Sequence, residues 1–123
     1  MKLGAPALAF TLALAGCSPP PDPAALARLE GGDVERGRSL LSHYQCGSCH
    51  VIPHVPAAAG RAAPSLAGFA RRSYIAGQVP NTPPNLVRWL QDPQALLPQA
   101  RMPDMGVHEA DARDMAAALL AQP

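Results

Sequence analysis

The feature that most constrains this chain is the five-residue motif Cys46-Gly47-Ser48-Cys49-His50, which lies within a sequence of 123 residues. The chain has few bulky side chains for a core: one tryptophan, two tyrosines and two phenylalanines, against fifteen prolines and ten glycines. A single domain of this composition is expected to need a disulfide, a metal ion or a cofactor for its stability. The motif contains the residue types that each of these would use.

Four chemistries could use the motif, and the surrounding sequence separates them. A thioredoxin-like pair would follow a strand in a βαβ unit, but a helix is predicted before Cys46. A structural zinc site needs four ligands, and the sequence offers no second cysteine pair and no other histidines at ligand spacing. A disulfide would leave His50 without a role, whereas covalent haem attachment uses two thioether bonds and the histidine as iron ligand. We therefore predict one covalent haem c held by Cys46, Cys49 and His50.

The start of the chain reads as a targeting segment. Residues 1–16 combine one basic residue, an apolar stretch and a small-residue site, as in a secretory signal peptide. The four residues Leu-Ala-Gly-Cys that end at Cys17 resemble the bacterial lipoprotein box, which implies that Cys17 carries acyl chains. The alternative is a plain signal peptide followed by a free thiol. We expect residues 17–30 to form a lipidated cysteine with a proline-rich tether, and residues 31–123 to form the domain.

Helical patterns occupy much of this domain. One helix is predicted from Asp33 and one from Thr82, both good N-cap residues, and a third over roughly 109–121. No segment shows convincing strand alternation, and long irregular loops are expected over residues 51–81 and 93–107. The predicted fold class is therefore all-α.

From residue 33 to residue 121 the chain resembles the small monohaem class I cytochromes c. The resemblance rests on four elements in the family's order. These are the helix leading to the attachment motif, the loop Ala63-Pro64-Ser65-Leu66, the helix LVRWLQDP, and the loop LLPQARM before the last helix. It implies a small cytochrome c fold, with three main helices and long loops wrapped around one covalent haem.

The resemblance also implies the axial ligands of the iron. His50 would bind one face and Met102 the other, because methionine favours the reduced state. Met105 is the alternative sulfur, and we expect it to pack or to be exposed. His54 is a poor rival, since the chain would have to pass round the haem edge within four residues.

Other positions take their expected roles from the same resemblance. The carbonyl of Pro64 would accept the Nδ1–H of His50, Trp89 would pack on haem, and Arg72 would neutralise a propionate, with Arg71 as the alternative. Weaker propionate candidates are Tyr74 and Asn81. In the family the last helix often presents an aromatic residue to a glycine of the first helix. Here Ala118 and Leu120 are available against Gly37, so either a leucine fills that gap or the two helices cross more closely.

These expectations lead to a functional hypothesis. The protein would be anchored to a bacterial membrane through Cys17, face the periplasm or cell exterior, and carry single electrons between respiratory partners such as a terminal oxidase or a dehydrogenase. With both axial positions filled, we expect an electron carrier and no enzyme, although it could be a redox subunit of an oxidoreductase complex. One alternative is a haem protein in which a labile Met102 permits peroxidase-like activity or gas sensing. Another is a lipid-anchored structural protein without haem.

The charge pattern of the chain bears on whether nucleic acid is a partner. The formal net charge is +1, and all the positive charge except that of Lys2 is arginine. Without basic runs or aromatic residues interleaved with basic ones, no nucleic acid is expected as a partner. Removal of residues 1–16 takes away Lys2 and no acidic residue, so the formal charge falls from +1 to 0. Because the mature chain is formally neutral, we expect the rate of electron transfer to depend only modestly on salt concentration.

Overall fold

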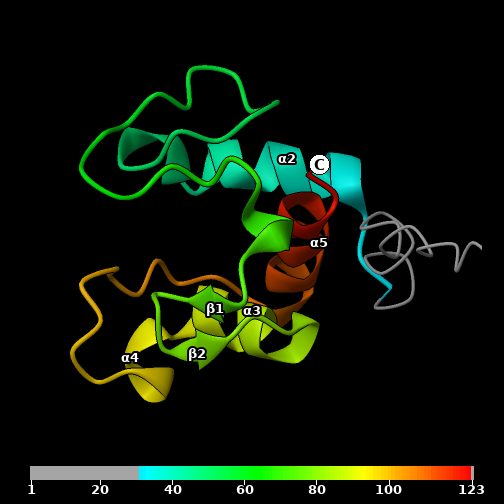
Figure 1. Cartoon of the computed structure of the whole chain (residues 1–123). Coiled ribbons are helices and arrows are strands. Elements are labelled where there is room, and N and C mark those ends of the chain that lie inside the picture. Colours follow the sequence, from blue (N-terminus) through cyan, green and yellow to red (C-terminus); the bar gives the residue numbers. More distant parts are fainter. Residues whose placement is uncertain (1–30, 123) are drawn as a thin grey trace, which may run out of the picture.

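The computed structural model describes residues 31–122 (Figure 1). Its helices are α2 (Val34–His43), α3 (Pro83–Gln91), α4 (Pro93–Leu96) and α5 (Glu109–Leu120), with 3₁₀ turns at Cys46–Ser48 and Phe69–Arg71. Two short strands, β1 (Tyr74–Ile75) and β2 (Val79–Pro80), pair antiparallel with Ile75 opposite Val79. The predicted signal peptide, tether and lipidated Cys17 lie outside the described residues. No helix within residues 31–122 is both long enough and apolar enough to span a membrane.

The three main helices begin where the sequence indicates. The Asp33 carboxylate accepts a 2.9 Å hydrogen bond from the Arg36 amide, and the Thr82 hydroxyl accepts one of 3.4 Å from the Asn85 amide. Both are ordinary N-caps. The third helix begins at Glu109 without a side-chain cap. These three helix predictions are confirmed in position.

Two regular segments arise inside the loops expected to be irregular. Asp92 ends α3 and also caps α4, because its carboxylate accepts a 3.0 Å hydrogen bond from the Ala95 amide. Pro93 then occupies the first helical position, which suits proline. The β1–β2 pair lies in the other expected loop. The assignment to the all-α class stays a prediction, since the described residues hold these strands beside four helices.

Helices α2 and α5 cross in close contact at Gly37. A Cβ atom at Gly37 would overlap the carbonyl oxygen of Asp114 and lie 2.9 Å from the Cβ of Ala118. Of the two alternatives left open at this crossing, the closer approach is therefore the one observed. Figure 1 shows α5 contacting α2 on one side and α3 on another. The largest fully buried side chains are Leu41, Leu86, Pro93, Met115 and Leu119.

A polar cluster joins the same two helices. The Arg36 guanidinium donates to the carboxylates of Asp111 and Asp114. Asp114 also accepts a 2.7 Å hydrogen bond from the Asp33 amide, and Asp111 accepts one of 2.8 Å from the Tyr44 hydroxyl. These side-chain bonds bridge 67 to 81 residues of sequence, and no periodicity in the sequence indicates them. They fix the angle at which α2 meets α5, and so place the attachment motif that follows α2.

Candidate functional site

The attachment motif follows α2 through a tight change of direction. Gln45 adopts a left-handed conformation, with φ of +58°, and leads the chain into the 3₁₀ turn Cys46–Ser48. The carbonyl of Cys46 then accepts hydrogen bonds from the amides of Cys49, at 3.2 Å, and His50, at 3.0 Å. The half-buried Cys46 and the exposed Cys49 carry free thiols. Burial raises the pKa of the Cys46 thiol, so this side chain stays protonated at neutral pH.

His50 has a defined orientation. Its Nδ1 atom lies 2.6 Å from the carbonyl oxygen of Pro64. A carbonyl can only accept a hydrogen bond, so Nδ1 carries the proton, and in the neutral ring the free lone pair is then on Nε2. The resemblance predicted this hydrogen bond, and it is present. The loop that supplies Pro64 is held by two backbone bonds, from Ala63 N to Cys49 O of the motif at 3.0 Å and from Leu66 N to Val51 O, just after the motif, at 2.8 Å.

Two glycines allow the next loop to fold back over the motif. The Gly60 amide donates a 2.9 Å hydrogen bond to the Gly47 carbonyl. A Cβ atom at Gly47 would lie 2.6 Å from the Cα atom of Ala58, and one at Gly60 would overlap the backbone of Ser48. Both positions therefore require glycine for steric reasons. Gly60 was not among the predicted site residues, although an isolated glycine in a loop is the signal for such an approach.

An apolar pocket brings the motif together with distant segments. It is lined by Leu41, Cys46, His50, Leu66, Phe69, Leu86, Trp89, Leu90, Met102 and Leu119. Its walls come from α2, α3 and α5 and from the loops that follow α2 and α4. In Figure 1 both of these loops lie to the left of α5. The pocket is partly open to solvent, and its volume is about 50 Å³. Four predicted site residues, Cys46, His50, Trp89 and Met102, thus share one pocket.

The two methionines differ in their surroundings. Met102 is half-buried and lines the pocket, whereas Met105 is 38% exposed and does not. The peptide of Met102 is held from α4, because the Gln94 amide donates hydrogen bonds to the carbonyls of Ala100 at 3.0 Å and Met102 at 2.7 Å. Gln94 was not among the predicted site residues, because a lone glutamine forms no sequence motif.

Arg72 does not line the pocket. Its guanidinium donates to the carbonyl of Ser65 and sits 5.5 Å from the ring centroid of Phe69, a residue that lines the pocket. The Asn81 amide donates to the carbonyls of Phe69 at 3.1 Å and Arg72 at 3.0 Å. The Oδ1 atom of Asn81 is buried without a hydrogen-bond partner. Arg72 therefore holds a loop together, and the propionate roles of Arg72, Arg71, Tyr74 and Asn81 stay predictions.

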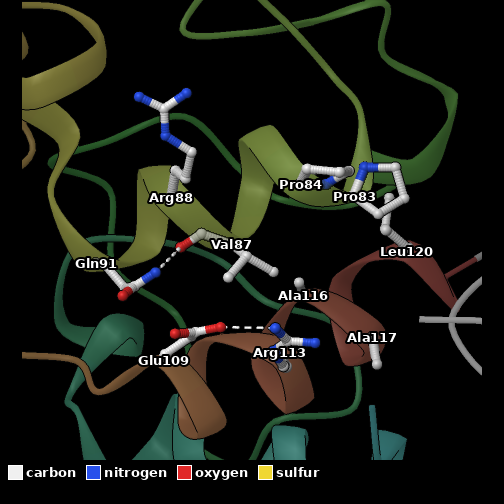
Figure 2. Close-up of a pocket in the computed structure, with 10 residues that line it drawn as sticks. All are labelled: Pro83, Pro84, Val87, Arg88, Gln91, Glu109, Arg113, Ala116, Ala117 and Leu120. Carbon is white, nitrogen blue, oxygen red and sulfur yellow. Dashed lines mark hydrogen bonds and ion pairs between the residues drawn. The ribbon is translucent and has the colours of Figure 1, made fainter. Parts of the chain in front are cut away.

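A larger cavity, of about 380 Å³, lies between α3 and α5, away from the motif (Figure 2). It is lined by Pro83, Pro84, Val87, Arg88, Gln91, Glu109, Arg113, Ala116, Ala117 and Leu120. A 2.6 Å ion pair between Glu109 and Arg113 lies at its edge, and the Arg88 guanidinium points away from it (Figure 2). None of the residues predicted to form the site lines this cavity, so it does not belong to the site.

The residues at the apolar pocket fit a covalently bound haem. Two free thiols at the motif could form thioethers, and the pocket carries an oriented imidazole and a thioether sulfur, ligands that suit iron. The side chains between them are almost entirely apolar, as a macrocycle requires. A porphyrin is larger than the space in this partly open pocket, so it would displace the walls or extend out of the opening. Across residues 31–122, no group of three or more histidine, cysteine or acidic side chains is placed to hold a metal ion.

Comparisons with known proteins relate part of this chain to a respiratory enzyme. Over 82 residues it is 34% identical to cytochrome c oxidase subunit 2 of Alkalihalophilus pseudofirmus, which covers 64% of this chain and 23% of that protein. Over 71 residues it is 34% identical to cytochrome c oxidase subunit 2 of Bacillus subtilis, which covers 56% of this chain and 20% of that protein. The chain thus spans less than a quarter of the length of the curated relatives it matches. No protein-family model and no solved structure matches it.

These similarities correct one expectation. The expectation that the protein is no enzyme is wrong, because both matched proteins are subunits of an oxidase. Two protein ligands on one iron would exclude a substrate from that iron. They would not exclude a substrate from another catalytic centre in the same protein complex. The similarities support an electron-transfer role in respiration.

Proposed function

We propose that this chain is a haem-c-bearing electron-transfer domain of a membrane-bound respiratory oxidoreductase. The observation that carries the proposal is the shared pocket. His50, oriented by Pro64, lines the same apolar space as Cys46 and Met102. In this proposal Cys46 and Cys49 form the thioether bonds, His50 and Met102 bind iron, and the domain adopts a class I cytochrome c fold over residues 31–123. The haem would supply reversible one-electron exchange.

The residues of the chain would tune that exchange in three ways. The hydrogen bond from His50 to the Pro64 carbonyl fixes the ring and raises its basicity. Methionine sulfur at Met102 favours the reduced state and raises the potential. The apolar walls, including Trp89 at 7% exposure, exclude water from the site and so disfavour the added charge of oxidised iron.

The partner and the membrane anchor are part of the proposal. Because the matched proteins are subunits of cytochrome c oxidase, a terminal oxidase is favoured over a dehydrogenase as the partner. The lipoprotein box supports acylation of Cys17 and a position on the outer face of a bacterial membrane. Attachment of two or three acyl chains there would hold the domain firmly at the bilayer, where its redox partner lies.

Visible spectra of the oxidised and dithionite-reduced protein, made in a bacterium with a haem-attachment pathway, test the proposal. We expect a sharp reduced α-band and the weak far-red band of ferric iron bonded to sulfur. Met102→Ala should abolish the far-red band, and the matched control Met105→Ala should keep it. The Cys17→Ala variant should lose membrane association but keep the spectrum.

Other outcomes of the same experiment would contradict the proposal. A high-spin spectrum of the wild type would mean an open sixth position and would favour the peroxidase-like or gas-sensing alternative. Loss of the far-red band in Met105→Ala, but not in Met102→Ala, would show that Met105 and not Met102 supplies the sulfur. Absence of bound haem after export would overturn the central claim.

A further inference from the structure

The side chain of Gln94 ties the Met102 loop to a helix. Gln94 lies on α4, is half-buried, and directs its amide nitrogen at two carbonyl oxygens, those of Ala100 at 3.0 Å and Met102 at 2.7 Å. A side-chain amide carries two N–H donors. The two donors can therefore serve both bonds, one to the peptide between Ala100 and Arg101 and one to the peptide that follows Met102.

The loop itself offers little other restraint. Within the described part of the chain, the segment from Pro98 to Val107 makes one backbone-to-backbone hydrogen bond, from Ala100 N to Leu97 O at 2.8 Å. Its prolines have no N–H to donate. The hydrogen bond from Gly106 N to Asp104 Oδ1, at 2.8 Å, is local to the loop. The carbonyl of Met102 thus gains its restraint from Gln94.

The helix that carries Gln94 is well supported. Asp92 caps α4 through the Ala95 amide at 3.0 Å, and Pro93 is among the most fully buried residues of the described chain. Asp92 also ends α3, whose residues Leu86, Trp89 and Leu90 line the pocket. Gln94 therefore connects the loop to the same wall that forms one side of the pocket.

We infer that Gln94 is a positioning residue for the axial ligand Met102, an inference that rests on the proposed ligation of iron by His50 and Met102. Its two hydrogen bonds hold the Met102 peptide in place before and after the sulfur binds. When they are absent, the loop gains conformational freedom that binding of the sulfur must remove. The sulfur then competes less well with ligands added from solution.

Displacement of the sulfur from the ferric holoprotein tests this inference. Imidazole is titrated into the protein, and loss of the far-red iron–sulfur band gives its dissociation constant. Gln94→Leu keeps the size of the side chain but removes both donors. Two neutral hydrogen bonds predict that imidazole binds about tenfold more tightly to this variant than to the wild type. The matched control is Gln91→Leu, because the half-buried Gln91 donates only to Val87 O of its own helix, at 3.4 Å. We expect it to match the wild type.

A second variant separates donation from packing. Gln94→Glu keeps the shape of the side chain, but its ionised carboxylate cannot donate. Imidazole should bind this variant more tightly than the wild type at neutral pH. The ratio of the two dissociation constants, each expressed for the free base of imidazole, should approach one as the pH falls toward the carboxyl pKa, about 4.3 in an unperturbed glutamate. A merely structural role would produce no such pH dependence relative to the wild type.

Three results would overturn the inference. If the wild type shows the iron–sulfur band and Gln94→Leu binds imidazole with the wild-type affinity, Gln94 does not position Met102, although the proposed ligation stands. If Gln91→Leu and Gln94→Leu weaken the sulfur bond equally, the effect is general loosening of the fold. If the wild type lacks the iron–sulfur band, both the inference and the proposed function fail.

Discussion

Gly37 of α2 and Ala118 of α5 meet where the two helices cross, so closely that a Cβ atom at Gly37 would lie 2.9 Å from that of Ala118. The same atom would overlap the carbonyl oxygen of Asp114. A glycine at this point therefore sets the separation of the two helices. The attachment motif follows α2, and Leu119 of α5 lines the apolar pocket, so this separation also affects the width of the site.

Substitution of Gly37 should destabilise the protein. Gly37→Ala forces α2 away from α5, and overpacking of this kind costs typically about 1–3 kcal/mol of unfolding free energy. Urea unfolding followed by circular dichroism measures the change. The control is Gly77→Asn, because the space around Gly77 is open and asparagine tolerates its positive φ of +73°. Equal stability of Gly37→Ala and wild type would show that the helices separate without cost.

The polar cluster between α2 and α5 predicts how stability responds to pH. Hydrogen bonds from Tyr44 and Arg36 lower the pKa of Asp111 below its ordinary value. The hydrogen bond between Tyr44 and Asp111 also raises the pKa of Tyr44. A lowered carboxyl pKa contributes stability that is present above the unfolded-state pKa, about 3.9, and is lost as pH falls through the folded-state value. A raised tyrosine pKa contributes stability that is present below about 10 and is lost at higher pH.

The variant Tyr44→Phe isolates this contribution. It removes the hydroxyl that donates to Asp111 and leaves the ring in place. We expect the unfolding free energy to fall at neutral pH, and to depend less on pH both below about 4 and above about 10 than in the wild type. Unfolding curves collected across pH measure this. Parallel pH profiles for the two proteins would exclude the Tyr44–Asp111 bond as the cause.

Trp89 offers a direct optical report on the pocket. It is the single tryptophan of the chain, is 7% exposed, and lines the pocket beside Met102. A haem in this pocket would lie close enough to accept the excitation energy of the indole ring, so the folded holoprotein should show strongly quenched fluorescence. Unfolding in urea should restore part of the emission by moving the ring away. Bright emission from the folded, haem-loaded protein would place the haem elsewhere.

Gly60 is expected to matter for haem attachment. A Cβ atom there would overlap the backbone of Ser48, between the two cysteines of the motif. Gly60→Ala should therefore distort the turn that presents Cys46 and Cys49, and lower the fraction of protein that carries covalent haem, measured by mass spectrometry. Gly77→Asn again serves as the control, because it lies in open space. An unchanged haem content in Gly60→Ala would mean that the turn adapts.

Local sequence determined the parts of this protein that depend on short-range chemistry. Asp33 and Thr82 cap their helices because a short polar side chain can reach the free amides of the first turn. The motif from Cys46 to His50 indicates haem attachment because its residues are neighbours in sequence. The resemblance also indicated the contact of His50 with Pro64, which the structure contains. The roles of the motif and of Met102 toward iron remain predictions.

Tertiary structure decided the long-range contacts, because these contacts join groups that lie far apart in sequence. The sequence left open whether a leucine fills the space at Gly37 or the helices approach more closely, and only the position of Asp114 and Ala118 answers this. The bonds of Arg36 to α5 join residues separated by 75 and 78 positions, for which no periodicity exists. In the sequence Gln94 is an ordinary helix residue, and only the fold brings the carbonyls of Ala100 and Met102 to its side chain. Packing in three dimensions creates such contacts, and so it determines which methionine lines the pocket and what holds its peptide in place.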